Sequence, residues 1–185
     1  MIKAAPGRCP HNLQQLKCMF VSASRSGHAI PRTSSEGVTM SATGLAVFDE
    51  TLHKTNIWLK EIDEVVGSGR RGAYQALRAV LHCLRDRLTI DDAAQLGDQL
   101  PMLIRGIYYE AWHPAGKPER VRSHEEFLAW IGAHLPKTGL VDAEDAARAV
   151  FQVLDNHVSA GEIRDVMQSL PKEIRSLWPR PQTVI

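Results

Sequence analysis

The sequence of 185 residues is poor in cysteine and in aromatic residues, and no stretch of it stays apolar for long. Three cysteines, an odd and small number, give no disulfide framework, which favours a reducing compartment. No apolar run approaches the ~18 residues of a membrane span. The segment "LKCMFVSAS" is too short and too interrupted for the core of a signal peptide. We therefore expect a cytoplasmic protein with no membrane partner.

Neither sign of charge dominates. The chain has 22 Lys and Arg residues and 21 Asp and Glu residues, a net charge of +1 at pH 7. Residues 1–51 hold five basic and three acidic residues, so residues 52–185 hold 17 basic and 18 acidic ones, a net charge of −1. Domains that bind nucleic acid usually carry a basic excess or stripe. The even balance disfavours a nucleic-acid partner.

Sequence motifs of catalysis are also missing. No Walker loop, GxSxG or HExxH occurs, and we predict no catalytic residue, no metal ligand and no cofactor. Cys9, His11, Cys18 and His28 are residue types that bind metals, but their spacing fits no zinc pattern. The segment "GSGRRG" (67–72) resembles a phosphate loop, yet it lacks a preceding strand and a Lys-Ser/Thr pair. We interpret it as a helix C-cap and turn.

The N-terminal segment differs in character from the rest. Residues 1–39 include "SASRSGHAIPRTSSEG", which is rich in Ser, Gly and Pro and shows no helical period. Such composition is typical of disordered segments. We expect residues 1–39 to be a disordered or non-native extension, with Met40 as the true initiator or 1–39 as a loose tail.

From Met40 onward the pattern is helical, which predicts an all-α fold. Apolar residues and one threonine recur every three or four positions, as on one face of a helix: Phe48, Leu52, Thr55, Leu59, Ile62 and Val66. Gly67 and Gly69 should end this helix. After a second helix, Thr89 and Asp92 resemble a capping box. Pro101 lacks an N–H, so it marks a kink or the first turn of a new helix.

The scheme restarts after the segment "HPAGKPER" (113–120), whose Pro and Gly residues are typical of a linker. Three further helix starts carry capping pairs: Ser123 with Glu126, Asp142 with Asp145, and Ser159 with Glu162. The predicted organisation is an extension at 1–39, unit 1 at 40–113, a linker at 114–122, unit 2 at 123–179 and a tail at 180–185.

An internal repeat explains this restart. "QLPMLIRGIYY" (99–109) returns as "SLPKEIRSLWP" (169–179), and residues 76–109 and 146–179 share nine identities in 34 positions at an offset of 70. About two would be expected from average residue frequencies. We predict a duplication in which each unit has three main helices, the third broken at Pro. The units should pack on each other and bury Trp58 and some aromatics of 104–112.

Two arginine pairs are identical in both copies, Arg78 with Arg148 and Arg105 with Arg175. They could form a paired anion or carboxylate site. We favour the structural alternative, in which each arginine bridges to an acid or to a helix end.

The segments "ALRAVLHCLRDRL", "QLPMLIRGIYYEAWHP" and "HVSAGEIRDVMQSLPKEIRSLWP" resemble a bacterial family catalogued as domain of unknown function 2267. The resemblance covers about residues 44–179. It implies a small all-helical protein, and it brings no activity and no catalytic residues with it.

The most unusual local composition is "GIYYEAWHP" (106–114). Tyr109 and Trp112 could pin the linker, or they could anchor a partner, since Tyr and Trp dominate interface hot spots. Glu110 could act as an acid in a pocket, although no second titratable residue lies at a useful spacing. With Arg105 and His113, these residues form the predicted interaction site.

Three hypotheses of function remain open. The favoured one is a non-enzymatic helical interaction or scaffold module that binds a protein partner, and that self-associates as a homo-oligomer, through a groove between the repeats. The second is a small-ligand-binding protein or enzyme with a pocket near Arg105, Glu110 and Trp112. The third, nucleic-acid binding, is disfavoured by the charge count.

Overall fold

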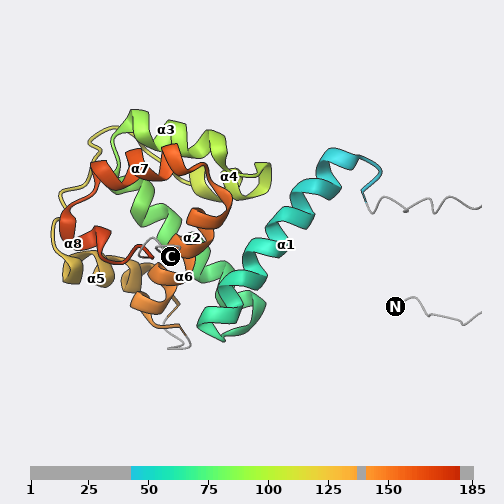
Figure 1. The fold of residues 1–185 in the computed structure, drawn as a ribbon, viewed down its shortest axis with the longest axis horizontal. Helices are drawn as coiled ribbons and strands as arrows, with labels where there is room; N and C mark the ends of the chain where they lie inside the picture. Colours follow the sequence, from blue (N-terminus) through green and yellow to red (C-terminus); the bar gives the residue numbers. More distant parts are fainter. Residues whose placement is uncertain (1–42, 137–140, 180–185) are drawn as a thin grey trace, which may run out of the picture. The chain divides into compact units, whose positions relative to one another are not determined.

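A computed structural model describes residues 43–136 and 141–179. All regular elements in these two ranges are helices, which confirms the all-α prediction (Figure 1). The helices are α1 (Ala46–Val66), α2 (Gly69–Arg87), α3 (Ile90–Gln99), α4 (Met102–Tyr109), α5 (His124–His134), α6 (Ala143–His157), α7 (Ala160–Ser169) and α8 (Lys172–Arg175). The predictions for residues 1–39, for Met40, for Cys9, His11, Cys18 and His28, and for the tail at 180–185 lie outside the described residues.

Local sequence signals set most of the helix ends. Gly67 adopts φ 65°, a left-handed conformation that glycine tolerates best, and its N–H donates to the Asp63 carbonyl at 2.8 Å to close α1. Ser123 and Glu126 form both arms of the predicted capping box at the start of α5. The side chains of Thr89, Asp142 and Ser159 also accept backbone N–H groups in the first turns of α3, α6 and α7.

The segment 67–72 is only partly the turn that its glycines predicted. Gly67 caps α1 as expected, but Gly69 to Gly72 form the first turn of α2. Only two residues, Gly67 and Ser68, connect the two helices. A Cβ at Gly72 would lie 2.0 Å from the Ser68 hydroxyl oxygen, so this glycine allows the close approach that the short connection requires.

The apolar stripe of α1 is buried along only half of its predicted length. Thr55, Leu59 and Ile62 are buried, whereas Phe48 and Leu52 are 44% and 40% exposed. The predicted helical face is therefore part of the core only from Thr55 onward. The reason is that the N-terminal end of α1 extends beyond the helices that cover the rest of it (Figure 1).

The core lies around α2 and α6, which pack against each other. Both α1 and α5 pack against both of these central helices. The helices α3 and α7 lie side by side (Figure 1). Trp58 and Tyr108 are buried, as predicted, and Phe151 stacks on Trp178 with ring centroids 4.0 Å apart. On α2, every side chain from Val80 to Leu84 is buried, because neighbouring helices cover this turn on several sides.

Helix boundaries recur at the offset of 70 residues. The helices α3 and α7 have ten residues each, and the C-cap residues that follow them are Leu100 and Leu170. Pro101 and Pro171 then precede α4 and α8, each as the N-cap of a separate helix. The proline thus starts a fourth helix in each predicted unit, rather than breaking a third one. The duplication and the unit boundaries stay predictions.

Candidate functional site

The segment from the end of α4 into the linker is fastened to α2 by a buried arginine. Arg85 is 3% exposed; its Nη1 donates to the carbonyls of Tyr108 and Glu110, and its Nε donates to Asp86 Oδ1 at 2.6 Å. Lys117 in the linker lies 2.9 Å from Asp86 Oδ2. Burial alone would raise the pKa of Asp86, but hydrogen bonds from Arg85 and Lys117 outweigh it and lower the pKa. Asp86 is therefore ionised and holds the linker.

Tyr109 packs onto α3, and Trp112 packs onto Tyr109. Their ring centroids are 5.4 Å apart, and the ring of Tyr109 also meets that of Tyr108 edge-on at 5.0 Å. The Tyr109 hydroxyl would lie 2.1 Å from a Cβ on Gly97, so α3 accepts this ring only because residue 97 is glycine. These contacts favour the interpretation in which the aromatics pin the start of the linker.

Glu110 does have a titratable partner, which spacing in the sequence could not reveal. Arg78 Nε donates to Glu110 Oε2 at 2.7 Å, from α2 to the residue that caps α4. The hydrogen bond from Arg78 lowers the pKa of Glu110, and the same bond raises the pKa of Arg78. This pair lines a hollow of about 330 Å³ together with Tyr74, Gln75, His134, Leu135 and Pro136. A carboxylate that is paired in this way is a weak general base.

Two further groups near this hollow are held in unreactive forms. Burial raises the pKa of the Cys83 thiol to about 12, so its nucleophilic thiolate is scarce near neutral pH. The ring of His134 lies 3.8 Å from the thiol, and its Nδ1–H donates to the Trp130 carbonyl at 2.8 Å. Burial lowers the pKa of His82, whose Nε2–H donates to the Ile107 carbonyl at 2.7 Å. Cys83 is a core residue, as predicted.

The duplicated arginines bond to helix ends or to acids. Arg105 Nη2 donates to the carbonyls of Asp98 and Leu100 at 3.2 and 3.1 Å, at the C-terminal end of α3. Arg175 bonds to the corresponding carbonyls at the end of α7, those of Gln168 and Leu170. Arg148 pairs with Glu144 at 2.7 Å, as Arg78 pairs with Glu110. In these contacts each arginine bridges to an acid or to a helix end, as the structural alternative expects.

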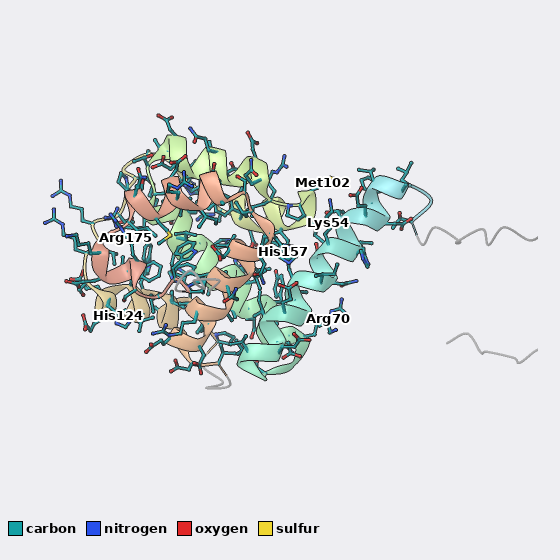
Figure 2. All side chains as sticks on the ribbon, in the orientation of Figure 1. Lys54, Arg70, Met102, His124, His157 and Arg175 are labelled. Atoms are coloured by element: carbon teal, nitrogen blue, oxygen red, sulfur yellow. The ribbon has the colours of Figure 1, made fainter. Side chains whose placement is uncertain are left out.

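A larger hollow lies between α1, the start of α4 and the end of α6. Its volume is about 550 Å³, within the range of small-molecule sites. We call it the α1–α4 cleft, and its lining residues are His53, Lys54, Ile57, Trp58, Gln99, Leu100, Pro101, Met102, Arg105 and His157. Figure 2 shows Lys54, Met102 and His157 near one another where α1 meets α4.

The wall on the α6 side of the cleft is fixed by contacts to α1. The ring of His157 stacks on Trp58 with centroids 5.3 Å apart, and its Nε2 lies 2.8 Å from Glu61 Oε1. Asn156 Nδ2 donates to the other oxygen of Glu61 at 3.3 Å. On the α4 side, the Leu103 N–H donates to the Thr51 hydroxyl at 3.0 Å. The cleft is therefore held on both sides before any ligand binds.

Beside the cleft lies a group of exposed large apolar side chains, which we call the α1 apolar patch. Its members are Leu45, Val47, Phe48, Leu52, Met102 and Leu103, which are 40–54% exposed. A second hollow of about 130 Å³ joins the two helices within it, lined by Val47, Glu50, Thr51, Lys54, Pro101 and Met102. The patch thus continues from α1 onto the start of α4.

The five predicted interaction residues do not share one cavity. Arg105 lines the α1–α4 cleft, and Glu110 lines the separate hollow with Arg78. Trp112 and Tyr109 are half-buried against the core, and His113 is exposed, with Nδ1 3.0 Å from the Ala111 carbonyl. An interaction role for this set stays a prediction.

Sequence reasoning missed the residues that surround Arg105 in space. His53, Lys54 and His157 approach it from α1 and α6. The available signal was weak: Phe48 and Leu52 continue an apolar stripe, and Met102 and Leu103 form the start of a short helix. Nothing in that spacing shows that neighbouring helices leave these residues uncovered.

The structure gives two negative findings for residues 43–136 and 141–179. No three His, Cys, Asp or Glu side chains gather there as they would around a metal ion. No helix there combines the length and the apolar composition that crossing a membrane needs.

Residues 55–177 match the family described as "Uncharacterized conserved protein (DUF2267)", within the range in which the sequence motifs resemble it. No curated protein matches the chain.

Proposed function

Since the chain belongs to the DUF2267 family, whose description names no activity, we propose a function from its surface. The protein is a non-enzymatic interaction module that binds an amphipathic helix of a protein partner. The observation that carries this proposal is the α1 apolar patch. At one end of the described fold, six large apolar side chains on α1, its N-cap residue and α4 are exposed to solvent.

Energetics favour a partner for this surface. Removing apolar surface from water contributes roughly 25 cal/mol per Å². Phe48 and Leu52 lie four residues apart on the free half of α1, and Met102 adds the side wall of a hollow. Helix-in-groove recognition uses anchors at this helical spacing. A partner helix that packs between α1 and α4 would cover both walls of the hollow.

The polar clusters support a non-enzymatic role. Glu110 is paired with Arg78, and the Cys83 thiol has a pKa of about 12. Asp86 is engaged by Arg85 and Lys117 and holds the linker. Each of these groups has a structural partner that a catalytic role would have to break.

A second copy of this chain is one source of the partner helix. The free half of α1 is itself an amphipathic helix, and the hollow beside it is an apolar receptor. Two copies related by a twofold axis could each place α1 on the other's hollow. The same interaction would then form either a homo-oligomer or a complex with a different protein.

The test uses two charge insertions on one helix. Phe48→Glu places a carboxylate in the patch, and Val65→Glu places one at an exposed apolar position of α1 outside it. Light scattering after size exclusion and affinity purification at native expression level are run on all three proteins. We expect self-association, or one enriched partner, to be lost in Phe48→Glu and kept in Val65→Glu. A monomeric wild type with no partner, or equal loss in both variants, would contradict the proposal.

A further inference from the structure

The α1–α4 cleft has a charge pattern that the α1 apolar patch does not explain. Its lining carries Lys54, Arg105 and two imidazoles, those of His53 and His157. No carboxylate belongs to the lining that the structure describes. A hollow whose lining includes the cations of Lys54 and Arg105 and no acid favours a negatively charged ligand over a positively charged one.

Two carboxylates that contact lining residues from outside the lining are already engaged. Glu61 accepts from His157 and Asn156, and Glu50 lies 2.8 Å from Lys54. The pair of Lys54 and Glu50 is highly exposed, with side chains 53% and 63% accessible. An exposed pair of this kind on a helix contributes little to stability. A bound anion can therefore recruit Lys54 at little cost.

Arg105 is the fixed cation of the cleft. Its Nη2 is held by the carbonyls of Asp98 and Leu100, so the guanidinium keeps its place. Its Nε–H is buried and has no hydrogen-bond partner among the described residues. The corresponding Nε–H of Arg175 donates to the Leu170 carbonyl at 2.7 Å. That buried Nε–H is out of a ligand's reach, but Arg105 lines the cleft and brings its positive charge there. A side chain that is already held loses little entropy when it binds.

The remaining walls are apolar or aromatic. Ile57, Pro101 and Met102 line the cleft together with the ring of His157, which is stacked on Trp58. A volume of about 550 Å³ also exceeds what a single inorganic ion would fill. The geometry points to a ligand with two parts: the α1–α4 cleft binds a small organic anion. Its oxyanion lies between Arg105 and Lys54, and its flat apolar body lies against the imidazole of His157.

The binding test uses the full chain labelled with ¹⁵N and an aromatic carboxylate, 1-naphthoate, as the probe. Its neutral analogue, 1-naphthalenemethanol, has the same ring and no charge. Amide shifts in two-dimensional NMR spectra locate each compound. We expect saturable shifts at Lys54, Arg105 and His157 with 1-naphthoate, and binding about tenfold weaker for the alcohol, the difference that one charge-assisted contact makes. Inorganic phosphate alone should bind more weakly than 1-naphthoate.

Two matched variants test the charge directly. Lys54→Glu breaks the pair with Glu50 and reverses one charge of the cleft. Lys60→Glu breaks the corresponding pair with Glu64 on the same helix, outside the lining. We expect Lys54→Glu to weaken 1-naphthoate binding about tenfold and Lys60→Glu to leave it unchanged. Replacing Arg105 would also disturb the end of α3, so Lys54 carries the test.

Three results would overturn the proposal. The first is equal affinity for 1-naphthoate and for its alcohol, which would reduce the site to apolar contact. The second is a set of shifts confined to Phe48 and Leu52, which would assign the probe to the α1 apolar patch. The third is equal affinity in Lys54→Glu and Lys60→Glu. None of these outcomes depends on whether a protein partner binds the patch, so the two proposals fail separately.

Discussion

The surroundings of Arg105 and of Arg175 show how two matching segments diverge. Both arginines hold the last carbonyls of a ten-residue helix, and both follow a proline by four positions. Around Arg105 the helices leave the α1–α4 cleft open. Arg175 lies on α8, which packs on α5. There Phe127 of α5 is buried and faces Phe151, which stacks on Trp178. Figure 2 shows Arg175 and Lys54 on opposite sides of the view.

The difference teaches that helix ends and interior filling are decided by different residues. Caps, prolines and arginine clamps recur in both segments and fix where helices begin and end. Side chains that arrive from other helices decide whether the space beyond is filled. Ile57 is half-buried beside the cleft, whereas residue 127, which is 70 positions later, is a fully buried phenylalanine. Four predictions test this contrast, from the largest expected effect to the smallest.

Phe127→Ala should cost about 3–5 kcal/mol of unfolding free energy, because it leaves a cavity beside Phe151 in a packed interior. Ile57→Ala should cost about 1 kcal/mol or less, because its side chain already borders open space. Urea denaturation followed by circular dichroism measures both values. Equal losses would mean that the two sides are packed alike.

Gly97→Ala should cost about 1–3 kcal/mol, because its Cβ would meet the ring of Tyr109 and force it off α3. The matched control is Gly106→Ala on α4, where a Cβ meets nothing within 4 Å; it should gain roughly 0.5–1 kcal/mol from helix propensity. The residue 70 positions after Gly97 is Met167, so the contact with Tyr109 has no equivalent in the second half. Thermal denaturation of the two variants decides; a stabilised Gly97→Ala would show that the tyrosine moves freely.

Arg175→Met should destabilise the protein more than Arg105→Met, by about 2 kcal/mol against about 1 kcal/mol. Arg175 uses both Nε and Nη2 on carbonyls, at 2.7 and 3.1 Å, whereas Arg105 uses Nη2 alone. Methionine keeps much of the apolar length of the side chain. Guanidinium chloride titrations of both variants give the ranking, and the reverse order would contradict the difference in their clamps.

His82 should make the free energy of unfolding depend on pH, and its counterpart in the second half, Gln152, has no titratable group. Burial lowers its pKa, against the opposing effect of its bond to the Ile107 carbonyl. The unfolded histidine has a pKa of about 6.5, so its contribution is complete above that pH and is lost as the pH falls through the lower folded value. The melting temperature of the wild type should therefore drop more between about pH 7.5 and about pH 5.5 than that of His82→Gln.

Glutamine is the natural control because residue 152, the counterpart of His82, is an exposed glutamine. The other histidines are the same in both proteins, so the difference between the two curves isolates His82. Parallel curves would show that the ring is solvated at both pH values.

The parts of the fold that sequence predicted are those set by neighbouring residues. Ser123 with Glu126, Ser159 with Glu162 and the glycine at 67 act within one helical turn, so their spacing was enough. Hydrophobic periodicity placed α1 but overestimated its burial, because a stripe at Phe48 and Leu52 looks the same whether or not another helix covers it.

The candidate sites were harder because they join distant segments. Arg78 and Glu110 are 32 residues apart, and Glu61 and His157 are 96 residues apart. Arg85 was not distinguished from other arginines in the sequence, although it is buried and organises the linker. Periodicity cannot show which charged residues meet in space, and so Arg105 was grouped with its sequence neighbours rather than with Lys54 and His157.

The crossed packing of the first helices bears on assembly. Because α1 rests on α6 and α5 rests on α2, each half supplies a helix that completes the other. The same pairings would form if the two halves came from different chains, so a closed monomer and an exchanged dimer differ mainly in the tether between them. Asp86 holds that tether through Lys117 and the Glu119 N–H, which shortens its free span. An ion pair at the linker thereby sets how much of the tether a closed or an exchanged arrangement can use.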